Sequence, residues 1–380
     1  MNENFIDRNF MPEFMPDLYA AQPAKFIAPP TQRLPQLLRQ TLARESAASR
    51  TPAGMLALLV DAGLDRLPLP GRGATLQRWQ CLAMVAAVDL SLAKLYEGHT
   101  DALAILAELN AAAPAGSIWG VWCAEPPDGK VAFQHDGSIR VLLSGRKMWC
   151  SGAATVSHAL VSCWDDAGKP WLAAVALDQA GVRVTGDGWQ AVGMAGSASV
   201  DVVFDEADAT LVGDSGSYVH RAGFWHGGAG IAACWYGAAQ AIGDYLHQAV
   251  RAAEARQGAD PHRLAQLGMV DIALAGAAAL LREAAAAIDA NPANPADPAA
   301  DPSADAGTLA LRARLTVEAA AMLTLQHTTR ALGAGPLCRD PHFARMAADL
   351  PVFLRQSHAE RDLAALGRML GERPESPWAL

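Results

Sequence analysis

Aromatic side chains are scarce in this chain of 380 residues: Phe, Trp and Tyr together make up 6% of it, whereas hydrophobic residues as a whole make up 51%. Alanine is correspondingly abundant, which is typical of helices that pack closely through small side chains. A chain of this length and hydrophobic content can bury a sizeable core, arranged as two or three domains or as one large multilayer unit.

Positive charge is also in short supply. The 30 Lys and Arg residues against 39 Asp and Glu residues leave a formal net charge of −9, which argues against nucleic acid or an anionic membrane surface as a partner. The six cysteines form no C-x-x-C pair and no regular framework, so we expect free thiols in a reducing compartment. The N-terminus, MNENFIDRNF, lacks a basic start followed by an apolar run, which predicts no secretion signal and a cytoplasmic protein.

Several site motifs are missing as well. No spacing of His, Cys, Asp and Glu predicts a metal site, and the sequence contains neither a P-loop nor a nucleophile elbow. The apolar stretch Ala229–Leu246 nearly reaches transmembrane length, but it consists largely of Ala and Gly and contains Gln240 and Asp244. This composition favours a buried core helix, so we expect no membrane partner.

The patterns that are present divide the chain into three sections. After an irregular arm that extends to about Pro30, apolar residues recur at helical spacing to Asn110, and we assign residues 1–113 to an N-terminal helical domain. From about Gly116, short runs alternate with period two between Gly, Asp and Pro turns, which predicts an antiparallel β-domain over residues 114–213. After Asp214 the pattern is helical again, and we assign residues 214–380 to a C-terminal helical bundle.

The C-terminal section is interrupted by Asp289–Gly307, a segment rich in Pro, Ala and Asp that is incompatible with a helix interior. We interpret this segment as a solvated loop that joins two antiparallel helices. The alternative is a binding tail.

Three motifs occur in the order that acyl-CoA dehydrogenases show. Trp122–Pro126 (WCAEP) lies where that family has C-x-T-E-P, Gly145–Ala153 (GRKMWCSGA) resembles its flavin-packing strand, and Gly188–Ala209 resembles the strand pair that follows. The resemblance covers about Leu34 to Leu370. It implies an α+β fold with an N-terminal helical domain, a central antiparallel β-domain and a C-terminal four-helix bundle, with the flavin at their junction. It also implies a homodimer or homotetramer.

A flavin needs an apolar wall against one ring face, hydrogen-bond donors near its N1, O2 and N5 atoms, and support for its phosphates. By resemblance, Trp149 supplies the wall and Ser151 the hydroxyl near N5; the alternative is a core aromatic and an ordinary turn residue. The strand of Trp122, Cys123 and Ala124 would also contact the flavin, although Ala124 stands where the family has a Thr.

The adenosine end of an FAD would depend on two further places. Arg256 stands in the position of the family's R-x-x-F-G motif, although no Phe-Gly follows it, and a solvated arginine at a helix end is the alternative. The run RALGAGPL, with Arg330, Gly333 and Gly335, stands where the family has a glycine turn that approaches the dinucleotide of the neighbouring subunit. An ordinary turn between helices is the alternative for this run.

The catalytic Glu of the family is missing from both of its usual places. One place aligns with Ser357 or His358, and the other with the FWHGG segment near Trp225–Gly228, which has no carboxylate. His358 is the best substitute as base or hydrogen-bond donor, and Asp362, four residues on, would share its helix face and orient it. His226 is a second candidate. The alternatives are a solvent-facing amphipathic helix for the first pair and a satisfied histidine at a helix start for His226.

Together the motifs predict a flavin-dependent oxidoreductase that oxidises an acyl thioester, such as an acyl-CoA, or a related small molecule, with FAD as hydride acceptor. One alternative on the same fold is a monooxygenase that uses reduced FMN, which needs no base for an α-proton. The other alternative is a flavin-free binding or assembly protein.

Overall fold

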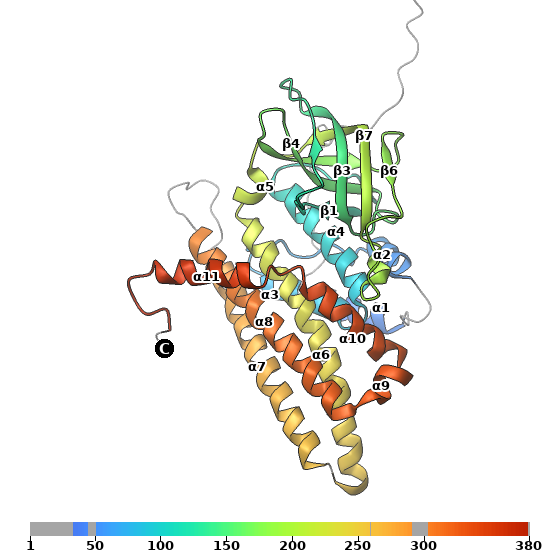
Figure 1. Cartoon of the computed structure of the whole chain (residues 1–380), viewed down its shortest axis with the longest axis vertical. Helices are drawn as coiled ribbons and strands as arrows, with labels where there is room; N and C mark the ends of the chain where they lie inside the picture. The colour runs from blue at the N-terminus through green and yellow to red at the C-terminus, as the bar shows by residue number, and fades with distance from the viewer. Residues whose placement is uncertain (1–32, 45–50, 259, 291–302, 379–380) are drawn as a thin grey trace, which may run out of the picture.

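The structure is a computed structural model, and it describes residues 33–44, 51–258, 260–290 and 303–378 (Figure 1). The irregular arm expected before Pro30 lies outside the described residues. Helices, then strands, then helices follow one another along the chain. The sheet lies at one end of the molecule, and a bundle of long helices extends to the other end (Figure 1).

The N-terminal section consists of α1 (Leu34–Arg44), α2 (Pro52–Asp61), α3 (Thr75–Ala86) and α4 (Leu90–Glu108). Side-chain caps explain two of the helix starts. The Thr51 hydroxyl accepts a hydrogen bond from the backbone N–H of Gly54 (3.2 Å) ahead of α2. The Asp89 carboxylate accepts one from the N–H of Leu92 (2.8 Å) and thereby starts α4. Helix α4 is buried along most of its length, because it packs against both the sheet and the C-terminal helices.

The middle section forms one sheet with these strands among the described residues: β1 (Trp119–Trp122), β2 (Val131–Ala132), β3 (Arg140–Cys150), β4 (His158–Trp164), β5 (Pro170–Ala176), β6 (Val182–Val184) and β7 (Val200–Leu211). The pairings run from β4 through β2, β3, β7 and β5 back to β4, so the sheet closes on itself. The prediction of an antiparallel sheet is wrong in part, since β4 pairs in parallel with both β1 and β2. Period-two alternation reports burial and not strand direction, which is why the sequence pattern missed these pairs.

The C-terminal section consists of α5 (Ser217–His220), α6 (Gly223–Gln257), α7 (Pro261–Ala290), α8 (Ser303–Leu332), α9 (Ala334–Arg339), α10 (Pro341–Leu354) and α11 (Glu360–Gly371), preceded by a short 3-10 helix, η1 (Ala195–Ser197), in the β-section. With 35 residues, α6 is about 50 Å long. Its small residues allow close packing, because a Cβ at Gly237 would lie 2.1 Å from the carbonyl oxygen of Ala83 in α3. The main core accordingly joins the N-terminal helices to α6, α7, α8 and α10.

The segment Asp289–Gly307 is more helical than predicted. Helices α7 and α8 extend into it from both sides, and residues 291–302 lie outside the described residues. Asp289 is held at the end of α7 because its carboxylate accepts hydrogen bonds from the backbone N–H groups of Gly73 and Thr75, each at 2.9 Å. This tertiary contact places a carboxylate at the start of α3, where it is electrostatically favourable.

The apolar stretch Ala229–Leu246 lies inside α6 and is largely buried, as expected of a core helix. Among the described residues, α7 is the helix that is long and apolar enough to cross a membrane by length and composition, and 17% of its most apolar window is buried inside the protein. A single helix of this kind says little about a membrane. It does mean that α7 presents apolar side chains such as Ile272, which is 70% exposed.

Candidate functional site

Trp149 stands at the end of β3, where that strand leaves its regular pairing with β7. The register shifts between Lys147 and Cys150, and Trp149 has a φ of 58°, a left-handed conformation that is strained for a bulky residue. The indole is directed outward and 48% of the residue is exposed. The alternative of a tryptophan buried in the core of the β-section is therefore wrong, and an apolar ring face is available to a planar ligand.

Next to Trp149, three serine hydroxyls form a hydrogen-bonded chain that starts at Ser151. The Oγ atoms of Ser151 and Ser199 lie 2.8 Å apart, and those of Ser199 and Ser197 lie 3.0 Å apart. Ser197 donates to the carbonyl oxygen of Met194 (2.8 Å), which can only accept. Since each hydroxyl has one hydrogen, Ser199 donates to Ser197, and Ser151 donates to Ser199. Ser151 is left with lone pairs to offer to a ligand.

Trp122, Cys123 and Ala124, at the end of β1 and just after it, lead to Ser151, which Trp122 contacts. We refer to the area formed by Trp149, Ser151 and Trp122 as the corner around Trp149. The Trp122 indole is buried and donates to the carbonyl oxygen of Ser151 (3.1 Å), so it orients the turn after Trp149. Cys123 is half-buried, and burial raises the pKa of its thiol to about 11. Ala124 is exposed. The structure therefore brings Trp122 and Ser151 together through a contact between protein groups.

Lys147 holds the same corner through a fully paired network. Its side chain is completely buried, and Nζ donates to Glu125 Oε1 (2.7 Å), to Ser162 Oγ (2.7 Å) and to the carbonyl oxygen of Ser162 (3.1 Å). The other carboxylate oxygen of Glu125 accepts from the Trp164 indole (3.1 Å). A buried lysine is tolerated when it is paired in this way. The network ties β3 to β4 and to the WCAEP segment after β1.

A second group of charged residues, which the sequence analysis did not identify, lies where α4 meets the start of α6. Lys94, Glu97 and Asp101 follow one another at helical spacing on one face of α4 and stay partly exposed, whereas most of the helix is buried. Asp101 approaches α6 so closely that a Cβ at Gly227 would lie 2.9 Å from its Oδ1 atom. Burial raises the pKa of the Asp101 carboxyl. A carboxylate thus does lie beside the FWHGG segment, but another helix supplies it.

The charged neighbours of Asp101 are paired with one another. Lys94 Nζ lies 3.0 Å from Glu97 Oε2, and Arg221 Nη1 lies 2.8 Å from Glu108 Oε2. Within the part of the chain that the structure describes, no hydrogen-bond donor or cation lies within bonding distance of the Asp101 carboxylate. We refer to these five residues as the α4–α6 polar cluster.

Tyr218 of α5 connects the α4–α6 polar cluster to the corner around Trp149. The Arg221 guanidinium lies 5.4 Å from the centre of the Tyr218 ring. Tyr218 and Cys123 pack against the same hydrophobic cluster, and burial raises the pKa of the Tyr218 hydroxyl well above its usual value. Because Cys123 directly follows Trp122, whose indole donates to Ser151, a continuous set of contacts joins the two areas.

The turn between α10 and α11 is fixed to the start of α6 by Arg314 of α8. This arginine donates to the carbonyl oxygens of Gly228 (3.1 Å) and Gln356 (3.2 Å), and its guanidinium lies 5.3 Å from the centre of the Trp235 ring. Burial lowers the pKa of the Arg314 guanidinium. Since Gln356 is two residues before His358, Arg314 brings the turn that carries His358 toward α6.

His358 and Asp362 do not share a helix face, so this prediction is wrong in its geometry. Helix α11 begins at Glu360, and Ala359 before it has a φ of 46°, which places His358 outside the helix. The two residues are nevertheless in contact. Asp362 accepts a hydrogen bond from the backbone N–H of His358 (3.1 Å), and its Oδ1 lies 3.5 Å from Nδ1 of the imidazole. The imidazole is 64% exposed, with Nε2 left for another partner.

His226, the second catalytic candidate, is buried with 6% of its surface exposed. Its imidazole packs on the loop before α3, where a Cβ at Gly71 would lie 3.0 Å from Nδ1. Burial lowers the pKa of this imidazole, which keeps it neutral at pH 7. His226 is thus a buried histidine near the start of α6, packed against the loop before α3.

The residues predicted for the adenosine end of an FAD are spread out within one chain. Arg256 is exposed in the last turn of α6, and the turn between α6 and α7 lies at the end of the molecule opposite the sheet (Figure 1). Arg330 is exposed near the end of α8, Gly333 separates α8 from α9 with a φ of 67°, and Gly335 lies in α9. These residues therefore lie near the ends of α6 and α8 and in α9, within the helical bundle.

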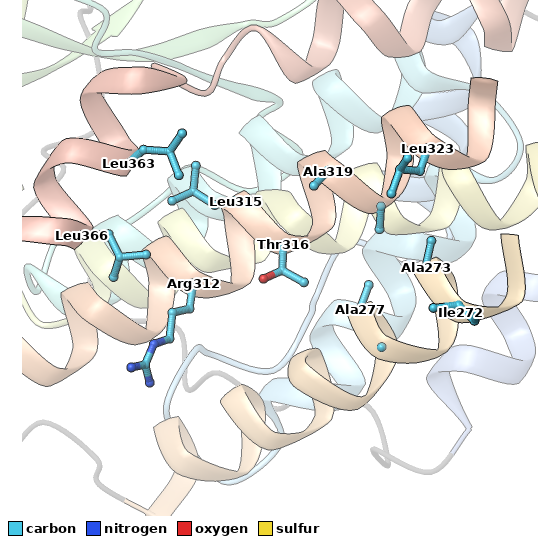
Figure 2. Close-up of a pocket in the computed structure, with 12 residues that line it drawn as sticks. Ile272, Ala273, Ala277, Arg312, Leu315, Thr316, Ala319, Leu323, Leu363 and Leu366 are labelled. Atoms are coloured by element: carbon cyan, nitrogen blue, oxygen red, sulfur yellow. The ribbon is translucent and has the colours of Figure 1, made fainter. Parts of the chain in front are cut away.

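A groove of about 520 Å³ lies outside both areas, between α7, α8 and α11. Its lining is mostly apolar, and Figure 2 shows Leu363 and Leu366 of α11 beside Leu315 of α8. None of the predicted cofactor or catalytic residues lines it. The groove is thus a surface of the helical bundle and separate from the corner around Trp149.

The cysteines and potential metal ligands add no second site. All six cysteines are free thiols, and Cys338 is the exposed one. Within the described ranges, no group of three or more His, Cys, Asp and Glu side chains could hold a metal ion.

No protein-family model and no curated protein matches this chain. Solved structures do match it. TdsC from Paenibacillus sp. A11-2, in complex with FMN and indole, has a TM-score of 0.73 at 19% identity, covering 91% of this chain and 97% of that chain. KijD3 in complex with FMN and a dTDP-linked 3-amino-4-keto sugar has a TM-score of 0.72 at 21% identity, covering 92% and 97%. The methanesulfinate monooxygenase MsuC from Pseudomonas fluorescens has a TM-score of 0.71 at 21% identity, covering 92% and 98%.

These proteins are flavoproteins with the acyl-CoA dehydrogenase fold, and the present chain has the same fold. It is a divergent example of that fold, which confirms the resemblance carried by the three sequence motifs. The identities are low enough that the likeness establishes the fold and not the reaction.

The corner around Trp149 offers a flavin an exposed apolar ring and, beside it, the Ser151 oxygen, which can accept a hydrogen bond. Two residues of interest were missed by sequence analysis. Ser199 lies within the Gly188–Ala209 motif, and Asp101 follows Lys94 and Glu97 at helical spacing along α4, which was the available signal.

Proposed function

We propose that this chain is a flavin-dependent monooxygenase that binds reduced FMN and oxidises a small-molecule substrate. The proteins of similar structure support this choice, since KijD3 and TdsC bind FMN, and TdsC and MsuC are a dibenzothiophene monooxygenase and a methanesulfinate monooxygenase. A monooxygenase also needs no base for an α-proton. This agrees with the missing Glu at Ser357, at His358 and in the FWHGG segment.

The direction of the serine hydrogen-bond chain carries the proposal. Because Ser151 donates to Ser199, its oxygen can only accept a hydrogen bond from a ligand. The N5 atom of an oxidised flavin has no hydrogen to donate, whereas N5 of a reduced flavin does. A Ser151 oxygen beside N5 therefore favours the reduced form, by about 1 kcal/mol for one hydrogen bond.

The positions of the distant arginines favour FMN over FAD. FMN lacks the adenosine half, so it does not require Arg256 or Arg330, which lie apart from Trp149 within one chain. An FAD would need these residues from a neighbouring subunit, as the family resemblance implies.

When bound, reduced flavin supplies two electrons to O2, so that one oxygen atom enters the substrate and the other leaves as water. The protein groups then have defined tasks. Trp149 covers one face of the ring, Ser151 accepts from N5–H, and Trp122 keeps the Ser151 turn in place. His358, oriented through Nδ1 by Asp362, holds or donates a proton at Nε2.

The test is an anaerobic titration of the purified protein with reduced and oxidised FMN. We expect the reduced form to bind at least about fivefold tighter, which corresponds to about 1 kcal/mol. Ser199→Ala should remove most of this preference, because the Ser151 hydroxyl can then donate to oxidised N5. Ser144→Ala is the matched control, since Ser144 is an exposed serine on the same strand as Trp149.

Trp149→Ala should weaken binding of both flavin forms about tenfold or more, through loss of the stacked ring, without unfolding the protein. Trp378→Ala, at an indole that is 78% exposed, should change nothing. If neither FMN nor FAD binds in either redox state, the chain is not a flavoenzyme, and the flavin-free binding or assembly protein becomes the better proposal.

A second candidate function is dehydrogenation of an acyl thioester with FAD. The observation in its favour is Asp101, which reaches the start of α6, one of the places from which the family draws its Glu. Protein that purifies with oxidised FAD and loses its yellow colour on addition of an acyl-CoA would establish this reading. A colourless protein that consumes O2 with reduced FMN would exclude it.

We also propose that two or more copies associate through α7, α8 and α11. The proposal is supported by exposed apolar side chains on these helices, namely Leu264, Met269, Ile272, Met322, Leu323 and Leu363. Three of them, Ile272, Leu323 and Leu363, line the apolar groove of Figure 2. Exposed apolar surfaces of this kind mark interaction sites. Sedimentation of Ile272→Asp against the unchanged protein tests it: a monomer in both cases would refute the oligomer.

A further inference from the structure

The groove between α7, α8 and α11 provides room for a ligand that the proposed reaction does not use. Its volume of about 520 Å³ lies within the range of small-molecule sites, which are mostly apolar and contain a few polar groups. Alanine and leucine side chains make up most of the lining. Among the described residues that line the groove, Arg312 carries the one charge and Thr316 the one hydroxyl.

Arg312 is a cation whose hydrogen-bond donors the folded chain leaves open. Within the described part of the chain it forms no hydrogen bond and no ion pair, and its Nη2 atom is buried without a partner. Two other arginines that contact α8 or belong to it are engaged: Arg314 donates to two backbone carbonyl oxygens, and Arg355 is paired with Glu318. A guanidinium presents its N–H donors in a planar fork that matches the two oxygens of a carboxylate. Arg312 is therefore suited to an anionic group of a ligand.

The rest of the groove is suited to an apolar tail that extends away from Arg312. Figure 2 shows Arg312 near one end of the groove, Thr316 in the middle and Leu323 near the other end. All three belong to α8, and the stretch of helix from Arg312 to Leu323 spans about 16 Å at 1.5 Å per residue. Alanines such as Ala277 and Ala319 line the groove between them, and their small side chains leave it open. Burial of a linear tail along this path would remove apolar surface of both partners from water.

We propose that this groove is a second binding site, which takes a small amphipathic carboxylate such as a medium-chain fatty acid. Arg312 pairs with the carboxylate, and the Thr316 hydroxyl, one helical turn further along α8, is an additional donor. The tail lies along α7 and α8 toward Ile272 and Leu323. The site does not rest on the proposed function, because none of its residues belongs to the corner around Trp149.

The groove lies on the face through which we propose that copies associate, and the charge of Arg312 favours the carboxylate as its occupant. An apolar surface of a second copy laid over the groove would withdraw Arg312 from water without pairing it. A carboxylate pairs the cation while its tail covers the apolar side chains. Exposed side chains outside the groove, such as Leu264, Met269 and Met322, remain available for contact with a second copy.

The experiment is a calorimetric titration of the full-length protein with three probes. Octanoate has a carboxylate and a tail, 1-octanol has a tail of the same length without the charge, and acetate has the charge without the tail. Arg312→Gln removes the positive charge and keeps a hydrogen-bonding side chain. Arg251→Gln is the matched control, since Arg251 is an exposed arginine of α6 that does not line the groove.

We expect octanoate to bind at least about tenfold more tightly than 1-octanol, as is typical of a charge-assisted hydrogen bond, and acetate not to bind measurably. In Arg312→Gln the ratio between octanoate and 1-octanol should fall to about one. In Arg251→Gln the ratio should stay as it is in the unchanged protein. If Arg312→Gln fails to fold, Arg312→Lys keeps the charge without the planar fork and should lower the ratio several-fold.

A second pair of variants tests where the tail lies. Ala319→Trp should weaken the binding of octanoate and of 1-octanol alike, because the indole fills the groove between α7 and α8. Ala286→Trp is the control, at an exposed alanine of α7 outside the groove, and should weaken neither.

Three outcomes would overturn the proposal: neither octanoate nor 1-octanol binds, the two bind equally well, or the preference for octanoate survives in Arg312→Gln. If neither probe binds and Ile272→Asp converts an oligomer into a monomer in sedimentation, a second copy occupies the groove instead. These measurements contain no flavin, so the proposed function can fail in the FMN titration without changing their result.

Discussion

The Lys147 network and the α4–α6 polar cluster both bury charged groups, but they differ in how far those groups are satisfied. Lys147 Nζ has three acceptors within 3.1 Å, and its partner Glu125 is itself bonded to Trp164. Asp101 has no donor within bonding distance among the described residues. The first arrangement stabilises a strand junction, whereas the second leaves one acceptor open.

The difference shows that burial of charge does not by itself mark a functional residue. What matters is whether the folded chain already supplies the hydrogen-bond partners. Lys147 and Glu125 lie within the motifs that resemble the acyl-CoA dehydrogenases, whereas Ser162 and Trp164 come from β4. Asp101 lies outside those motifs.

The largest expected effect concerns the satisfied network. Lys147→Met removes the cation and leaves Glu125 and Ser162 without their donor, which should lower the free energy of unfolding by about 3 kcal/mol. Urea unfolding followed by circular dichroism measures it. Lys130→Met is the control, since this exposed lysine only lies over the Trp164 ring (4.9 Å) and should cost less than about 0.5 kcal/mol. A loss below about 1 kcal/mol for Lys147→Met would remove the contrast between the two regions.

A smaller effect, on the rate of substrate oxidation, is expected at His358. His358→Ala should reduce substrate oxidation about 100-fold, as is typical for loss of a general acid or base, and leave FMN affinity within twofold. Turnover and flavin titration on the same protein sample separate the two quantities. Glu360→Gln, two residues on in the first turn of α11, should retain full activity. Unchanged turnover of His358→Ala would take this residue out of the site.

The smallest effect is a gain in stability from the open acceptor. Because burial raises the pKa of Asp101, stability is lost as the pH rises from the unfolded-state pKa to the folded-state pKa, and the loss persists above it. Asp101→Asn should therefore raise the free energy of unfolding at pH 8 by on the order of 1 kcal/mol, seen as a higher unfolding temperature than that of the unchanged protein. At pH 4 this increase in stability should be smaller. Glu97→Gln should not stabilise the protein at pH 8, because it breaks the pair with Lys94.

If Asp101→Asn is less stable than the unchanged protein at pH 8, the charged carboxylate stabilises the fold. Asp101 would then be satisfied in the folded chain, as Lys147 is, and the contrast between the two regions would be wrong. Thermal unfolding at the two pH values decides this without any ligand.

Parts of the fold could be predicted from sequence because their signals are local. The apolar spacing of Leu34–Arg44 and Pro52–Asp61 gave helices, and the alternation in His158–Trp164 gave a strand. The parallel pairing of β4 could not be predicted, because strand direction depends on which segments meet in space. The helical assignment of His358 failed because Ala359 adopts a positive φ, which residue composition does not signal.

The candidate site also contains residues that local sequence signals identify and residues that only tertiary contacts identify. Trp149 and Ser151 could be identified because they lie in one short motif, whose residues are neighbours in the chain as well as in space. The direction of the serine chain needed Ser197 of η1 and Ser199 just before β7, together with the carbonyl of Met194. The place of Asp101 needed the contact between two helices that are separated by the whole sheet in sequence.

The sequence by itself determined the order of helices and strands, the acyl-CoA dehydrogenase fold and the tryptophan–serine corner, because each is encoded by periodicity or by a short motif. The tertiary structure alone decided which charged groups are satisfied. It paired Lys147 with Glu125 and Ser162, and it set Asp101 against a glycine, with no donor within bonding distance among the described residues. Hydrogen bonding acts over about 3 Å in space and is blind to distance along the chain, so only folding reveals which acceptor remains open.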